Sequence, residues 1–197
     1  MILITGASGS VGKAVLAEVA RSGARYRAMY RSAKEAAKAP AGTETVIADF
    51  SDKASLAPAL GGVESVYLVC SPIPDLVQLE INVIEASQAA GVRRIVLNSA
   101  LGAGDYGKSF PSWHRQVEDK LKATKLAYCI LRPNSFMQNV LTCYAPSIRA
   151  QGAFYGAMGN ARTSYLDVRD IAVVAAKALR ARSIHTFYLN ALLPEAP

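Results

Sequence analysis

Short apolar stretches alternate with helical patterns along most of the 197-residue chain. The first stretch, Ile2–Ile4, has no polar positions between apolar ones, which is typical of a parallel strand buried on both faces. Apolar residues then recur at helical spacing to about Arg21, where Ser22 and Gly23 favour a helix end. Further strands are predicted at residues 26–31, 43–48, 66–70, 95–97 and 126–131, and helices at residues 33–39, 53–60 and 75–90 and at a segment that ends at residue 125.

This alternation predicts an α/β fold, a doubly wound parallel sheet of Rossmann type with helices on both faces. No linker, repeat or low-complexity tract interrupts the chain, so residues 1–197 are expected to form one domain. Residues 134–160 are less regular and are expected on the substrate side. A short strand at residues 163–166, a helix at 171–181 capped by 167–170, and a last strand at 187–189 complete the prediction.

Three glycines, Gly6, Gly9 and Gly12, join the first strand to the first helix. Gly6 would make the sharp exit from the strand, Gly9 would let backbone N–H groups approach a pyrophosphate, and Gly12 would let the helix pack closely. The helix N-terminus adds unpaired donors and a positive dipole end, which favour an anion. The spacing is Gly-x-x-Gly-x-x-Gly instead of the common Gly-x-Gly-x-x-Gly, and a tight turn without a ligand is the alternative.

The second predicted strand ends in Arg31. In NAD-binding proteins an acidic residue near this position accepts from the ribose 2′-hydroxyl, whereas an arginine can pair bidentately with a 2′-phosphate. Arg31 therefore favours NADP(H) over NAD(H), and a surface arginine without a ligand is the alternative. At the third strand end, Asp49 could accept from an adenine amino group beside Phe50, or Asp49 or Ser51 could cap the next helix.

Charge and cysteine content exclude several other classes of function. The formal net charge of +7 comes with no basic helix of DNA-reading type, so no nucleic-acid partner is expected. Three cysteines without a Cys-x-x-Cys spacing indicate neither a disulfide framework nor a metal site. No apolar run has the length of a membrane span, and Met1 leads directly into the first strand. These features predict a cytoplasmic protein without a signal peptide or a membrane partner.

Together, these segments resemble the NmrA-like branch of the atypical short-chain dehydrogenases/reductases. The resemblance covers nearly the whole chain and is carried by residues 2–12, 30–32, 49–50, 82–100, 130–139 and 167–171. It implies a domain that binds NADP(H), with quinone reduction in some members and redox sensing without catalysis in others. The residues expected to contact the cofactor are Gly6, Ser8, Gly9, Ser10, Val11, Gly12, Arg31, Asp49, Phe50, Ser71, Pro72, Ser99, Pro133 and Asn134.

Many members of the superfamily use a Tyr-x-x-x-Lys pair, and the helix that should carry it here has His114 and Glu118 at the matching spacing. This departure removes the simplest alcohol-dehydrogenase mechanism. Hydride transfer to a quinone remains possible, because alignment of the two rings is the main requirement. His114 could donate a proton, since imidazole titrates near neutrality, and Ser99 is the second catalytic candidate. The alternatives are a scaffold histidine and a serine that caps a turn.

Relatives in this branch continue past the point where this chain stops, so the C-terminal substrate lobe is expected to be largely missing. The substrate pocket would then be shallow, supplied by a second subunit in a possible homodimer, or completed by Tyr106, Phe110, Trp113, Phe136 and Tyr144. The first hypothesis is an NADPH-dependent reductase of quinones or similar small carbonyl electrophiles. The second is a non-catalytic NADP(H)-binding redox sensor that acts through a protein partner. A nucleotide-sugar epimerase fits poorly without the tyrosine–lysine pair.

Overall fold

The computed structural model describes residues 1–103, 110–156, 159–160, 164–181 and 187–190 of the chain. Within them, the main sheet has the strand order β3-β2-β1-β4-β5-β6-β9, and all its pairings are parallel. The bounds are β1 Ile2–Ile4, β2 Tyr26–Tyr30, β3 Glu44–Ile47, β4 Ser65–Leu68, β5 Arg94–Asn98, β6 Ala127–Arg132 and β9 Phe187–Asn190. Winding reverses at β1, where Ile2 pairs with both Tyr26 and Ser65. The predicted doubly wound sheet is therefore confirmed.

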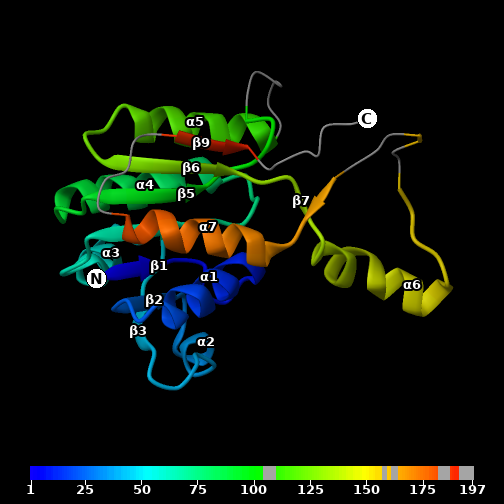
Figure 1. The fold of residues 1–197 in the computed structure, drawn as a ribbon, viewed down its shortest axis with the longest axis horizontal. Coiled ribbons are helices and arrows are strands. Elements are labelled where there is room, and N and C mark those ends of the chain that lie inside the picture. Colours follow the sequence, from blue (N-terminus) through cyan, green and yellow to red (C-terminus); the bar gives the residue numbers. More distant parts are fainter. Residues whose placement is uncertain (104–109, 157–158, 161–163, 182–186, 191–197) are drawn as a thin grey trace.

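Helices cover both faces of this sheet (Figure 1). On one face α1 (Ser10–Arg21) packs against α7 (Val168–Arg180). The other face carries α3 (Lys53–Leu60), α4 (Leu76–Ala89) and α5 (Phe110–Lys122). The short helix α2 (Ala33–Ala36) contacts β2 and β3.

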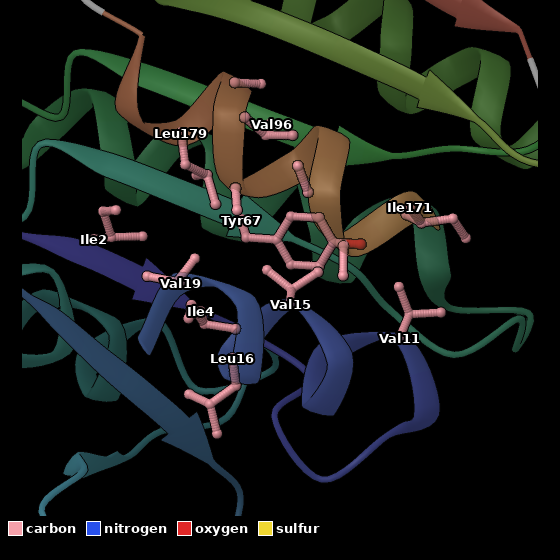
Figure 2. Close-up of a cluster of buried hydrophobic side chains, with 14 of the residues drawn as sticks. Ile2, Ile4, Val11, Val15, Leu16, Val19, Tyr67, Val96, Ile171 and Leu179 are labelled. Atoms are coloured by element: carbon pink, nitrogen blue, oxygen red, sulfur yellow. The ribbon is translucent and has the colours of Figure 1, made fainter. Parts of the chain in front are cut away.

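Successive side chains of the central strands belong to the cores on opposite faces of the sheet, because strand side chains alternate between the two faces. Ile2 and Ile4 of β1 join α1 and α7, whereas Leu3 joins the core beneath α3, α4 and α5. Figure 2 shows the first of these cores, with the Tyr67 ring among side chains of α1 and α7. The Tyr67 hydroxyl donates to Asn98 Oδ1 at 3.1 Å, so a fully buried polar group finds a partner.

The segment at residues 134–160 contains more regular structure than the sequence predicts. Strand β7 (Ser135–Phe136) pairs in parallel with β8 (Tyr165–Leu166), and a π-helix, η1 (Val140–Tyr144), leads into α6 (Ala145–Gln151). The expectation of irregularity is wrong for these helices. Periodicity gave no signal because η1 and α6 have no buried residue, and Leu141 is 69% exposed. In Figure 1, α6 projects away from the main sheet.

Smaller differences concern where elements end. Strand β4 ends at Leu68, so Val69 and Cys70 belong to its exit loop. Helix α5 ends at Lys122, three residues before the predicted end. Among the described helices, none combines the length and the apolar character needed to cross a membrane.

Candidate functional site

The turn after β1 needs glycine at two of its three glycine positions. Gly6 has a φ of +59°, and a Cβ there would lie 2.6 Å from Val69 Cγ1. A Cβ on Gly12 would lie 2.0 Å from the carbonyl oxygen of Gly6. For Gly9 the nearest atom would be 3.3 Å away, which is a tight contact without a hard clash. Gly6 and Gly12 thus shape the turn, while Gly9 would meet only this one tight contact.

Helix α1 starts at this turn and presents its N-terminus without a side-chain cap. Gly9 is the N-cap residue, and its carbonyl accepts from the Lys13 N–H at 3.0 Å. No side chain of the described residues caps the first turn, which also contains no acidic residue. The N–H groups and the positive dipole end are therefore available to an anion.

A cavity of about 360 Å³ opens at the carboxyl edge of the sheet, where this turn lies. Its walls include most of the residues that the sequence predicts to contact a cofactor. These are Gly6, Ser8, Gly9, Ser10, Val11, Gly12, Arg31, Asp49, Phe50, Ser71 and Pro72. Phe136, predicted to line the substrate pocket, also borders the cavity. The sequence prediction missed further lining residues, of which strand-end topology could have pointed to those at the ends of β2, β3 and β4. The missed residues are Met29, Tyr30, Ala48, Val69, Cys70, Ile73, Leu79 and Asn139.

Arg31 is an exposed cation on the β2 side of this cavity. It makes no hydrogen bond or ion pair with another described residue, although its charge lies close enough to lower the pKa of Asp49. The larger causes of that lowered pKa are the hydrogen bonds from the side chain and backbone of Ser51, at 2.6 Å and 2.8 Å. The Asp49 carboxylate thus closes a local turn in the cavity wall.

The capping alternative for Asp49 and Ser51 is wrong. The side chain of Asp52 caps α3 by accepting from the Ala54 N–H at 3.1 Å. All three side chains can cap a helix, so composition could not distinguish them. Sequence reasoning also gave no role to Asn82, whose Nδ2 donates to the Phe50 carbonyl at 2.9 Å and fixes the loop after β3.

Ser99, Glu118 and Arg132 form a second polar cluster, at the ends of β5 and β6. The Ser99 hydroxyl donates to Glu118 Oε1 at 2.7 Å. Arg132 donates from Nε to Oε1 at 2.8 Å and from Nη2 to Oε2 at 2.5 Å. Burial raises the pKa of Glu118, but these hydrogen bonds and the charges of Arg132 and Lys122 outweigh it, so the pKa lies below its ordinary value. Ser99 therefore binds Glu118 instead of capping a turn.

His114 lies one helical turn before Glu118 and is buried, with 3% of its surface exposed. Its Nδ1 has no hydrogen-bond partner among the described residues, and the Phe110 ring packs edge-on at 4.7 Å between centroids. Burial lowers the pKa of His114 to about 4, against a smaller opposing effect of the Glu118 charge. The imidazole is thus neutral near pH 7, and the expectation that it titrates near neutrality is wrong.

The remaining predicted residues lie outside the cavity wall. The Pro133 carbonyl accepts from Leu101 N at 2.8 Å, and Asn134 Nδ2 donates to Ser164 Oγ at 3.0 Å. Trp113 packs against the core beneath α5. The Tyr144 ring contacts Phe154 at 5.3 Å between centroids. Tyr106 lies outside the described residues.

The profile of one protein family matches most of the chain. The profile of the family described as NAD(P)H-binding matches residues 6–182. The chain belongs to this NAD(P)H-binding family. The match begins at the first glycine of the turn and ends just beyond α7.

Two curated relatives of this NAD(P)H-binding protein are reductases by name. It is 34% identical over 181 residues to the NAD(P)H azoreductase of Xenophilus azovorans, covering 91% of this chain and 63% of the relative. It is 32% identical over 183 residues to quinone oxidoreductase 2 of Escherichia coli (strain K12), covering 91% of this chain and 64% of the relative. The chain thus spans less than two thirds of the length of these relatives.

A solved structure supports the same relationship. The crystal structure of the NADPH-dependent quinone oxidoreductase from Escherichia coli complexed with NADPH matches with a TM-score of 0.82 at 31% identity. The match covers 93% of this chain and 66% of that chain. Together with the family match, this confirms the resemblance to the NmrA-like atypical short-chain dehydrogenases/reductases.

Proposed function

We propose that this NAD(P)H-binding protein is an NADPH-dependent reductase that transfers a hydride to a quinone or a similar small carbonyl electrophile. One observation carries the proposal. The glycine turn, the N-terminus of α1 and Arg31 all border one cavity at the carboxyl edge of the sheet, and no described side chain caps that helix or pairs with Arg31. In open α/β sheets, ligands bind at this edge, where the winding reverses.

The residues of the cavity suit the parts of NADPH. The cavity beside the Gly9 backbone and the first N–H groups of α1 would hold the pyrophosphate. Arg31 would pair with the 2′-phosphate. This pairing would favour NADPH over NADH, because NADH has only a hydroxyl at that position. The Asp49–Phe50 loop would border the adenine, and Ser71 and Pro72 would border the cofactor from the loop after β4.

When bound, the reduced nicotinamide supplies the hydride. A quinone that accepts it becomes a hydroquinone anion, which can take its proton from water. Burial lowers the pKa of His114 to about 4, so its neutral imidazole would not act as a cationic acid at pH 7. The protein's main contribution is then to orient the two rings and to exclude water between them. Phe136, half-buried at the edge of the cavity, is the lining residue that we propose for the substrate side.

The relatives support this choice of reaction. An NAD(P)H azoreductase and a quinone oxidoreductase both align with nine tenths of this chain. These activities are those of longer proteins. For this chain, the reductase activity therefore has to be measured on the chain itself.

The test is a titration of the purified protein with NADPH and with NADH, followed by a simple quinone while nicotinamide absorbance is recorded. We expect tight NADPH binding, weaker NADH binding, and oxidation that depends on the quinone. Tight binding without oxidation over a panel of acceptors would contradict the reductase and favour the redox sensor. Absence of NADPH binding would contradict both.

A further inference from the structure

A second cavity, of about 440 Å³, lies next to the cavity at the carboxyl edge of the sheet. Its walls come from the glycine turn, from α1, from the end of β2 and from residues 35–40. Ser8 and Tyr30 border both cavities. The two cavities are therefore neighbours that share one wall. Of the residues that the sequence predicts to contact a cofactor, Ser8 alone lines the second cavity.

Two lysines line the second cavity without a partner for their charges. Lys13 lies on α1 and Lys38 follows α2, and both residues are exposed. Neither ammonium group forms a hydrogen bond or an ion pair with a residue that the structure describes. The half-buried Glu35 of α2 supplies one carboxylate to the same cavity. Arg31 directly follows Tyr30 and borders the first cavity, next to the shared wall.

The charges around the shared wall suit a phosphate monoester. Three positive side chains and one negative side chain give a local charge of +2. A phosphate monoester carries about −1.5 to −2 charges at pH 7, together with three strong acceptor oxygens. An ammonium group has three donors and no acceptor, so a lysine is a common partner for phosphate. The second cavity thus has both the donors and the charge that such a group needs.

The shared wall also lies where the adenosine ribose of NADPH would be expected. In the proposed function, the pyrophosphate lies at the Gly9 backbone and the adenosine half lies at Arg31. The ribose connects these two parts, so it would lie beside Ser8 and Tyr30. A phosphate on its 2′-oxygen can then extend past this wall toward the second cavity.

We propose that Lys13 and Lys38 are specificity-determining residues that bind the 2′-phosphate of NADPH from the second cavity. This rests on the proposed function, in which the first cavity binds the dinucleotide. The phosphate would lie between these lysines and Arg31, so the choice of cofactor would depend on three cations from three different segments. NADH has an uncharged hydroxyl at this position and would gain nothing from either lysine.

The experiment measures the dissociation constants of NADPH and NADH for the unaltered chain and for Lys13→Gln and Lys38→Gln. Because both lysines are exposed, the variants should fold as the unaltered chain does. Lys125→Gln is the matched control, since Lys125 is exposed, precedes β6 and lines neither cavity. Adenosine 2′,5′-bisphosphate and adenosine 5′-monophosphate are titrated in parallel, because they differ only in the 2′-phosphate.

We expect each of the two lysine variants to weaken the binding of NADPH and of the bisphosphate about three- to tenfold. The binding of NADH and of the monophosphate should stay within about twofold. Lys125→Gln should leave all four dissociation constants within about twofold.

Three results would overturn the assignment of the lysines. The first is an equal loss of NADPH and NADH binding, and the second is unchanged NADPH binding in both lysine variants. The third is binding of inorganic phosphate to the NADPH complex that both lysine variants lose, since the second cavity would then hold a separate anion. Each of these results leaves the proposed function intact. Failure of the unaltered chain to bind NADPH would instead overturn the proposed function, and this assignment with it.

Discussion

Gly6 and Gly12 approach so closely that a Cβ on Gly12 would lie 2.0 Å from the Gly6 carbonyl oxygen. The turn thus depends on the absence of a side chain at residue 12. Gly9 differs, because its nearest contact would be 3.3 Å away. All three glycines border the cavity, but a side chain would clash severely only at Gly6 and Gly12.

Gly12→Ala should lower the free energy of unfolding by about 3 kcal/mol or more, since the clash is with backbone. Gly9→Ala should cost about 1 kcal/mol or less but weaken NADPH binding, because the methyl group would enter the space assigned to the pyrophosphate. Urea unfolding and NADPH titration of both variants provide the measurement. Equal stability of the two variants would mean that the turn can widen to accept a side chain at residue 12.

Arg31→Asp should weaken NADPH binding at least tenfold and leave NADH binding within about twofold, because a carboxylate repels the 2′-phosphate. Arg93→Asp is the matched control, since Arg93 is an exposed arginine that precedes β5. It therefore lies at the amino ends of the strands, and the cavity lies at their carboxyl ends. It changes the net charge equally but should affect neither cofactor. If Arg31→Asp reduced the two affinities by the same factor, Arg31 would not contact the 2′-phosphate.

The burial of His114 predicts a loss of stability in acid. The unfolded histidine binds a proton below about pH 6.5, whereas the folded one does so only below about pH 4. Unfolded chains thus bind more protons between these values, and stability falls as the pH is lowered through this window. Relative to a His114→Gln variant, the protein should lose on the order of 2 to 3 kcal/mol between pH 7 and pH 4.5. Urea unfolding of both proteins at the two pH values measures this, and parallel losses would show that His114 is protonated in the folded state.

Glu80 predicts the opposite dependence between about pH 4.5 and pH 8. It is fully buried on α4, and neither carboxylate oxygen has a hydrogen-bond partner among the described residues. Burial raises the pKa of Glu80 to about 8, and the nearby backbone of Cys70 offsets only part of that rise. The folded chain thus holds a proton that the unfolded chain loses above about pH 4.5, so stability falls as the pH rises toward 8.

Glu80→Gln removes this titration and retains the shape of the side chain. Between pH 5 and pH 9 the melting temperature of the unaltered protein should fall by several degrees more than that of the variant. Thermal unfolding of the two proteins in matched buffers gives the comparison. An equal change in both melting temperatures would place Glu80 in contact with water or with a charge partner.

The position of the cavity could be predicted from the sequence, because the carboxyl ends of all strands in a parallel sheet lie at one edge. Arg31, Asp49 and Ser71 each follow a different strand, and each borders the same cavity. Topology alone could not reveal that Glu118 accepts from both Ser99 and Arg132. That contact depends on how α5 is rotated about its axis. The helical pattern predicts which face of α5 is buried, but not which residues that face contacts.

Two other features had no usable signal in the sequence. The pKa of His114 depends on burial beside Phe110, and a histidine in a mixed polar helix gives no indication of its exposure. Helix α6 has no buried residue, so the periodicity that identified α1 and α7 was absent. The residues at the strand ends could thus be predicted from their types and positions in the sequence. Contacts between elements that are distant in the sequence are visible only in the structure.

The packing of α7 on α1 has a consequence for synthesis of the chain. The glycine turn and α1 are translated before α7, whose Ile171 and Leu179 belong to the core that packs on α1 (Figure 2). A nascent chain that has not reached residue 168 leaves the side of α1 that packs on α7 exposed to solvent or to chaperones. The glycine turn is therefore made well before α7, and α1 is fully covered only after about 160 further residues have been translated.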